Sequence, residues 1–196
     1  IQRLVGSEMC IRDRSNTNEL LWELGSSDLA SAGGGNTIFP DASSGPVYET
    51  PPLEEPLYFG GLPRLHVNVN TATVGGQIYA LLEDCDGANC IHIGHAIMDL
   101  RYHAGGADEQ TWTPVFEEIT ALMEFFPMDV EVAAGHTIKL TLRSTGEDYL
   151  PSAASTAVTV VNAGSTLQLD TFDPSTREYY KTVQCTEQIC IDNLEV

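Results

Sequence analysis

Apolar and polar residues alternate along much of the chain, a period of two that is typical of β-strands with one buried face. In residues 65–70 leucine and valine alternate with histidine and asparagine. Residues 137–143 repeat the pattern with Ile138, Leu140 and Leu142 on one side. The same reasoning predicts further strands at 19–24, 57–59, 77–83, 95–102, 121–126, 158–161 and 166–169.

Turn-forming clusters separate these segments, among them AGGGN at 32–36, CDGAN at 85–89 and STGED at 144–148. No segment carries a sustained apolar helix stripe, so nothing would cover the faces of a parallel sheet. About nine short strands with glycine-rich turns predict an all-β fold, an antiparallel β-sandwich. We expect a jelly roll of the galactose-binding-domain-like kind.

The ends of the chain differ from its middle. Residues 1–14 carry a net charge of +1 against −20 for residues 15–196, and GSEMCIRDR looks like a translated adapter sequence. This terminus has neither the order nor the cleavage site of a signal peptide, and no run of about 18 apolar residues occurs. We interpret residues 1–14 as a sequencing artefact or disordered terminus, 15–172 as the domain, and 173–196 as a tail or the start of a truncated segment.

Acidic residues outnumber basic ones by 28 to 9, which gives a net charge of −19. Such a surface repels phosphate backbones and anionic lipid headgroups, so we expect no nucleic acid or membrane partner. Hydrophobic residues make up 42% of the chain, enough for a folded core.

Four of the five cysteines form two pairs at the same spacing, Cys85 with Cys90 and Cys185 with Cys190. Each C-x4-C pair fits a local disulfide, and an even count with little lysine suggests an exported or extracellular protein. A less favoured alternative is a zinc site that adds His92 and His95 to the first pair, although this spacing matches no standard pattern. A weaker one is a calcium loop formed by Asp84, Asp86 and Asn89.

Motifs of common enzyme classes are missing. The chain lacks the G-x-S-x-G of α/β-hydrolases, a phosphate-binding loop, a dinucleotide fingerprint and H-E-x-x-H. The adjacent pairs Glu54 and Glu55, and Glu117 and Glu118, would point apart and are typical of a solvated face. We therefore predict no catalytic residue, no metal-binding residue and no cofactor.

The histidines favour structural roles. His92 and His95 are three residues apart, so in a regular strand they would face opposite sides and could not share one metal ion. His66 alternates with core residues and is expected on the solvent face, while His103 and His136 lie at turns beside glycines.

One loop is a candidate for contact with a ligand or cleft. Asp148 and Tyr149 lie in STGEDYLPS, and loops at the ends of a sandwich carry its binding functions. The competing interpretation, which we favour, is a capped turn before Pro151.

Several segments together resemble a known family. They are YETPPLEEPLYFGGLPRLHVNVN at 48–70, GGQIYALLEDCDG, GHAIMDLRYHAGG, LMEFFPMDVEVAAGHTIKLTLRSTGEDYLPS and STLQL. In this order they look like the C-terminal domain of X-Pro dipeptidyl-peptidase, a domain shared with cocaine esterase and α-amino-acid ester hydrolases. The resemblance covers about residues 45–170. The cysteine pairs and the tail depart from it.

The resemblance implies a jelly roll that packs against a preceding α/β-hydrolase domain, the partner that would hold the Ser-Asp-His triad and bind the peptide or ester substrate. No triad residue can be carried onto this chain, which we expect to be inactive alone. Its role would be to bury part of the catalytic domain, to shape the cleft through loops 103–111 and 144–151, or to mediate homo-oligomers. Candidates for the docking patch are Trp112, Phe116 and Phe126.

The alternative hypothesis is a free-standing, secreted jelly roll that binds a carbohydrate or another ligand through aromatic and acidic loop residues.

Overall fold

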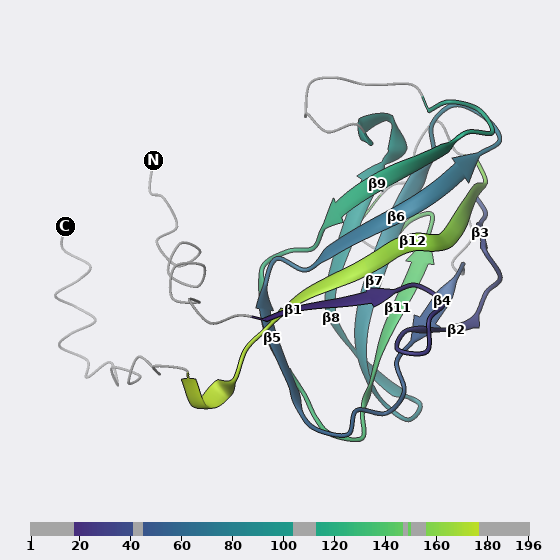
Figure 1. Cartoon of the computed structure of the whole chain (residues 1–196). Coiled ribbons are helices and arrows are strands. Elements are labelled where there is room, and N and C mark those ends of the chain that lie inside the picture. The colour runs from purple at the N-terminus through teal and green to yellow at the C-terminus, as the bar shows by residue number, and fades with distance from the viewer. Residues whose placement is uncertain (1–17, 41–44, 104–112, 147–148, 150–155, 177–196) are drawn as a thin grey trace, which may run out of the picture.

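The computed structural model describes residues 18–40, 45–103, 113–146, 149 and 156–176. Within these ranges the chain forms twelve β-strands and two short 3-10 helices (Figure 1). They are β1 (Asn18–Glu23), β2 (Ala30–Gly33), β3 (Thr37–Ile38), β4 (Val47–Glu49), β5 (Leu57–Gly61), β6 (Arg64–Thr71), β7 (Gln77–Asp86), β8 (Asn89–Asp99), η1 (Leu100–Tyr102), β9 (Glu118–Glu124), β10 (Met128–Val132), β11 (Thr137–Arg143), β12 (Val158–Thr171) and η2 (Pro174–Thr176).

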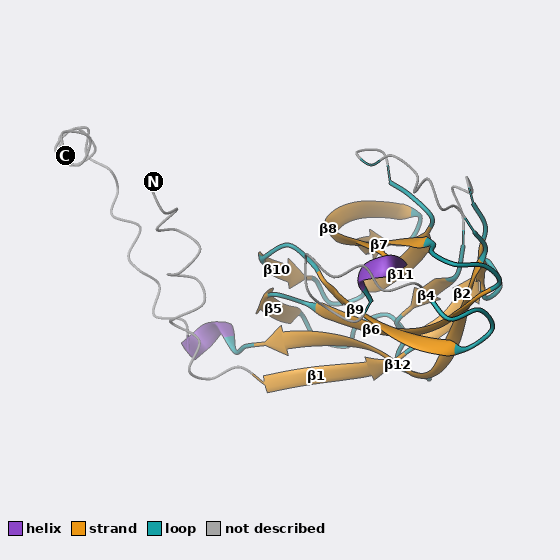
Figure 2. Cartoon of the chain, turned by 90° about the horizontal axis from the view of Figure 1, so that it is seen from above, coloured by secondary structure: helices purple, strands orange, loops and turns teal. Residues whose placement is uncertain are grey.

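The strands form two antiparallel sheets that face each other. Sheet A follows the order β10-β5-β12-β6-β9, and β1 and β3 also pair with β12. Sheet B follows the order β2-β4-β11-β7-β8. Figure 2 shows β7, β8 and β11 in one layer and β1, β6 and β12 in the other. The predicted antiparallel β-sandwich is confirmed.

Most connections carry the chain from one sheet to the other. The chain changes sheet between β1 and β2, again between β6 and β7, and again between β8 and β9 and between β11 and β12. Frequent crossing between two antiparallel sheets is the pattern of a jelly roll. The narrower galactose-binding-domain-like assignment stays a prediction.

The core fills the space between the sheets with alternate residues of each strand. Strand β6 illustrates the rule, because Leu65, Val67 and Val69 are completely buried while the residues between them are half-exposed. Large side chains from both sheets meet here, and the fully buried ones include Tyr48, Phe59, Ile78, Leu82, Met123, Phe125, Ile138, Leu140, Leu142, Leu167 and Leu169. The period-two pattern of the sequence is therefore the pattern of burial.

Strand β12 is the central element of sheet A. It joins two segments predicted as separate strands, 158–161 and 166–169, through a register shift between Val161 and Thr166. Ser165 holds this bulge, since its hydroxyl donates to the Val161 carbonyl at 2.5 Å and accepts from the Asn68 amide at 2.9 Å. One continuous strand thereby pairs with β1, β3, β5 and β6.

Several strand ends differ from prediction. The segment expected at 95–102 begins earlier, at Asn89, and ends at Asp99 because the Asp99 carboxylate accepts from the Arg101 amide at 3.0 Å and starts η1. The segment expected at 121–126 ends at Glu124, before the two phenylalanines. Strands β2, β3, β4 and β10 were not predicted. The first three have only two to four residues, too few to show alternation, whereas MDVEV of β10 does alternate and was missed.

A partly buried hydrogen bond links the two sheets. Tyr48 of β4 has no exposed surface, and its hydroxyl donates to Asn162 Oδ1 of β12 at 2.7 Å. Burial raises the pKa of Tyr48 to about 12, because the phenolate would lose its hydration.

The burial of Tyr48 predicts a specific loss of stability in alkali. Unfolded tyrosine ionises near pH 10, whereas folded Tyr48 keeps its proton until about pH 12. The unfolded state therefore binds fewer protons in that window, and the free energy of unfolding should fall as pH rises from about 10 to about 12. Urea unfolding between pH 9 and 12 measures it, with Tyr48→Phe as control. An equally steep fall in the variant would contradict the assignment.

Candidate functional site

The outer face of sheet B is unusually well covered. Tyr79 and Leu81 of β7 point away from the core, yet only 6% and 8% of their surfaces are exposed. By contrast, Leu21 and Leu122 on the outer face of sheet A are 54% and 46% exposed. Sheet B therefore buries apolar side chains on both of its faces, so other residues must cover its outer face.

A β-bulge in β8 brings two histidines together. Leu82 pairs with Gly94 and Glu83 with His92, so Ile93 is an extra residue in the strand. Such an insertion reverses the alternation of faces, and His92 and His95 then lie on the same side. His95 Nδ1 is 3.2 Å from His92 Nε2. The prediction that these side chains face opposite sides was wrong, because it assumed a regular strand.

Aromatic rings surround His95. Its Nε2 lies 3.1 Å from the Tyr149 hydroxyl, and its ring stacks on Tyr79 with centroids 5.5 Å apart. Phe126 meets it edge-on at 5.3 Å, and the His92 ring centroid lies 5.2 Å away. We call Tyr79, His92, His95, Phe126 and Tyr149 the histidine–aromatic cluster. It covers part of the outer face of sheet B.

Tyr149 belongs to the loop predicted to contact a cleft. Its carbonyl accepts from the Thr145 hydroxyl at 2.7 Å, and its amide donates to the Gly146 carbonyl at 3.1 Å. Gly146 has to be glycine, because a Cβ there would collide with the ring of Tyr79. The turn thus fixes Tyr149 against sheet B. Asp148, the other predicted residue, lies outside the described residues.

A depression of about 210 Å³ opens beside the cluster. Gly94 is one of its lining residues, and a Cβ at this position would collide with the Met128 methyl group. Phe126 forms part of its rim and is 61% exposed. The depression is lined by His92, Ile93, Gly94, His95, Phe126, Pro127 and Met128. It is mostly apolar with two imidazoles at one side.

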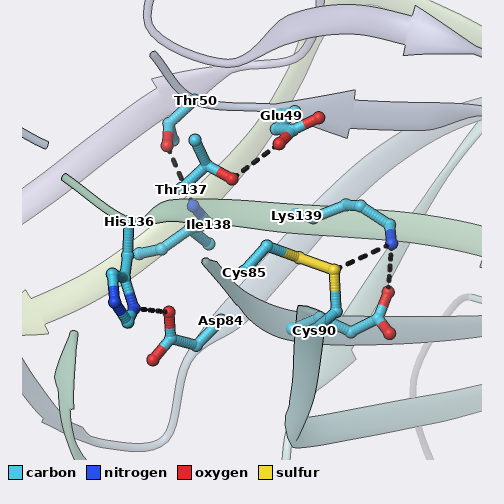
Figure 3. The surroundings of a disulfide bond; sticks show 10 residues. Glu49, Thr50, Asp84, Cys85, Cys90, His136, Thr137, Ile138 and Lys139 are labelled. Atoms are coloured by element: carbon cyan, nitrogen blue, oxygen red, sulfur yellow. Dashed lines mark hydrogen bonds and ion pairs between the residues drawn. A yellow bond between two sulfur atoms is a disulfide. The ribbon is translucent and has the colours of Figure 1, made fainter. Parts of the chain in front are cut away.

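A disulfide joins β7 to β8 (Figure 3). Cys85 and Cys90 are register partners next to a hairpin turn, and their Cα atoms are 4.0 Å apart. Lys139 Nζ lies 3.5 Å from Cys90 Sγ and 2.9 Å from Glu83 Oε2. The predicted bond between Cys85 and Cys90 is present. Cys185 and Cys190 lie outside the described residues.

The two metal alternatives find no support in this geometry. A disulfide removes both sulfurs as zinc ligands, and Asp84 instead pairs with His136 at 2.8 Å. Asp86 and Asn89 are exposed on the hairpin. In the part of the chain that the structure describes, no group of three or more His, Cys, Asp or Glu residues could hold a metal ion.

The remaining candidates lie apart from the cluster. His66 is half-exposed on the outer face of sheet A, and His103 Nδ1 contacts the Leu100 carbonyl at 2.7 Å behind η1. The carboxylate pairs are exposed, namely Glu54, Glu55, Glu117 and Glu118.

An exposed apolar tip stands at the other end of the sandwich. Phe116 is 78% exposed and has a φ of 60°, a left-handed backbone that disfavours any residue with a Cβ. Its amide donates to the Thr71 carbonyl at 2.9 Å, and exposed Val115 pairs with Thr71 through a β-bridge. With Val74, 43% exposed, these residues form what we call the Phe116 tip.

The predicted docking patch is therefore divided. Phe116 and Phe126 are both exposed, but they lie beyond opposite ends of β9, a strand roughly 20 Å long. Trp112, the third candidate, lies outside the described residues. Nothing in the sequence marks the backbone strain at Phe116 or the bulge in β8.

Comparison with known families identifies the domain. The family described as the X-Pro dipeptidyl-peptidase C-terminal non-catalytic domain matches residues 14–187. The chain belongs to this family. Membership agrees with the resemblance of its motifs and with the β-sandwich.

Solved structures show the same fold at low sequence identity. An aminopeptidase from a marine sediment Thaumarchaeota archaeon gives a TM-score of 0.58 at 12% identity over 81% of this chain and 33% of its own. A CocE/NonD family hydrolase from Staphylococcus aureus gives 0.63 at 9% over 81% and 37%, and an α-amino acid ester hydrolase 0.58 at 13% over 82% and 33%. The chain thus spans about a third of the length of each of these structures. No curated protein sequence matches the chain.

The disulfide predicts a protected pair of thiols. Alkylation without reductant should leave the peptide containing Cys85 and Cys90 unmodified, and reduction should expose both sulfurs. Replacing both by serine should lower the free energy of unfolding by about 2 kcal/mol, the value for closing so short a loop. Peptide mass mapping and urea unfolding measure these effects. Alkylation of both cysteines before reduction would contradict the bond.

The strained backbone at Phe116 predicts that glycine is better tolerated than phenylalanine. Phe116→Gly removes the left-handed penalty and an exposed ring, so the free energy of unfolding should rise by about 1 kcal/mol. Phe116→Ala is the matched control, because it removes the same ring but keeps a Cβ at the left-handed position. Urea unfolding of both variants provides the measurement, and equal destabilisation would count against strain.

Proposed function

We propose that this chain is the non-catalytic C-terminal domain of a larger serine hydrolase with dipeptidyl-peptidase or ester hydrolase activity. In this proposal an α/β-hydrolase domain of the same polypeptide precedes it and contains the catalytic triad. The family match over residues 14–187 carries the proposal. The predicted division into 1–14, 15–172 and 173–196 stays a prediction.

The sizes and names of the similar structures support it. Each is about three times the length matched here, which leaves room for a catalytic domain. They are called an aminopeptidase, a CocE/NonD family hydrolase and an α-amino acid ester hydrolase. The alternative of a free-standing ligand-binding jelly roll is not favoured by the family match.

The Phe116 tip is our candidate for the contact with the catalytic domain. Backbone strain at an exposed residue is costly, and such strain persists where it serves function. Phe116, Val115 and Val74 are three exposed apolar residues on loops tied together, since Gly75 donates its amide to the Thr113 hydroxyl at 2.6 Å. We propose that the catalytic domain covers this tip. We also propose that loops 103–111 and 144–151 border the cleft of the catalytic domain. Assembly into homo-oligomers stays a prediction.

Export is part of the proposal. A disulfide among the described residues suits an oxidising compartment. Among the described residues no helix is long and apolar enough to cross a membrane. We propose an extracellular or exported location on the strength of the cysteines.

The purified chain should have no hydrolase activity by itself. Because no residue of a triad can be assigned here, it should not release the chromophore from X-Pro p-nitroanilides or simple p-nitrophenyl esters above the buffer rate. It should also fail to react with a fluorophosphonate probe of activated serines. A full-length relative of the same family is the positive control. Turnover that is abolished by the probe would overturn the proposed division of labour.

A further inference from the structure

Three buried polar side-chain atoms of sheet B have no hydrogen-bond partner. In the described part of the chain these atoms are Glu83 Oε2, Thr141 Oγ1 and Arg143 Nε. Strand β11 directs its isoleucine and both leucines into the core, so its other side chains lie on the outer face. The three atoms belong to successive register pairs on this face, which are Glu83 with Lys139, Leu81 with Thr141, and Tyr79 with Arg143.

An ion pair accounts for only one of the three atoms. Lys139 Nζ lies 2.9 Å from Glu83 Oε2, so this oxygen has a partner of opposite charge. Thr141 is 4% exposed and its hydroxyl bonds to nothing, and the Nε of Arg143 is buried in the same way. A buried donor without an acceptor destabilises a fold, so such groups in native proteins point to a missing partner.

Arg143 differs from the other basic side chains in its lack of an acid. Of the lysines and arginines within the described ranges, it alone pairs with no carboxylate. This is unexpected in a chain with a net charge of −19. The other described basic residues each have an acidic partner, namely Arg64 with Glu124, Arg101 with Asp99, and Lys139 with Glu83.

The chemistry of this site favours a carboxylate as the missing partner. A guanidinium stays charged at every pH at which proteins fold, and it donates two parallel hydrogen bonds to a carboxylate from Nε and a terminal nitrogen. One cation balances one negative charge. A phosphate dianion would remain half-neutralised here, because Lys139 is already paired and the rest of the surface is acidic.

The neighbours of Arg143 would strengthen such a pair. Its register partner Tyr79 is 6% exposed, and the Tyr149 ring lies 5.9 Å from that of Tyr79. Buried aromatic groups lower the local dielectric, which strengthens an ion pair beside them. Thr141 leaves the same face of β11 about 7 Å along the strand, and its hydroxyl can donate to the group that carries the carboxylate.

We propose that Arg143, assisted by Thr141, binds a carboxylate that is supplied from outside this domain. Arg143 ends β11 and leads into the loop 144–151, which the proposed function places at the cleft of the catalytic domain. Under that proposed function the carboxylate belongs either to a side chain of the catalytic domain or to the terminus of a peptide substrate. Binding of a carboxylate by the chain itself does not depend on this context.

Nitrogen-15 correlation spectra of the arginine side chains test the proposal. In the purified chain, sodium acetate replaces sodium chloride at constant ionic strength, and acetate represents the carboxylate. The Arg143 Nε–H signal, assigned by its loss in Arg143→Lys, should shift and reach saturation. The Arg64 signal is the matched control and should not move, because Arg64 already donates to Glu124. Thr141→Val should weaken acetate binding severalfold. An unmoved Arg143 signal at molar acetate would overturn the proposal.

Thermal unfolding gives a second, independent measurement. A ligand that binds the folded state raises the melting temperature, so acetate should raise that of the parent chain above its value in chloride. Arg143→Met should lose this rise, and Arg64→Met should keep it. In chloride, Arg143→Met should melt no lower than the parent, since it removes an unpaired donor and keeps the apolar stem. A marked fall in chloride would reveal a partner within the chain and would contradict the proposal. The same conclusion would follow if Asp148→Asn shifted the Arg143 signal in chloride.

A comparison of ligands assigns the source of the carboxylate. A tripeptide with a free C-terminus is titrated beside its C-terminal amide, which should not bind. Affinity at least tenfold above that of acetate would support a substrate terminus, and equal affinity would support a side chain of the catalytic domain. The absence of any carboxylate binding would refute the site at Arg143 and leave the proposed function standing, because the family match carries that function independently.

Discussion

The pairing capacity of one strand determines the architecture of sheet A. A β-strand can bond to neighbours along two edges, and β12 uses both of them over fourteen residues. One edge receives β1 and β3, and the other receives β6 and, at its end, β5. The bulge at Ser165 lets β12 run as one strand while the sheet twists. The Tyr48–Asn162 hydrogen bond joins β12 to sheet B. Disruption of β12 would therefore remove partners from four strands together.

The bulge in β8 has a comparable effect on the chemistry of the surface. A regular strand would place one of the two histidines toward the interior, where an imidazole without partners is costly. The extra residue Ile93 instead brings His92 and His95 to the outer face beside Tyr149 and Phe126. Gly94, immediately after it, returns to the inner face and leaves space for Met128. One inserted residue thus creates both the histidine pair and the depression next to it.

Alternation along the chain predicts the sandwich and most of its core, because burial on one face is a property of each strand alone. Leu65, Val67 and Val69 behave as expected for this reason. The bulges depend on pairing with another strand, so they split β12 in the prediction and reversed the expected faces of His92 and His95. The Cys85–Cys90 bond was predictable, since it joins neighbours across a short turn. The left-handed Phe116 was not, because phenylalanine is a poor residue for that backbone.

The first and last strands of the described fold lie side by side, with Asn18 opposite Thr171 (Figure 1). The backbone consequently enters and leaves the sandwich at a single corner. A unit attached in this way can be added to another protein as a cassette, since its host chain needs no rerouting. The same arrangement governs its response to force: tension applied between the two ends would unzip β1 from β12 one hydrogen bond at a time, which is the direction of least mechanical resistance.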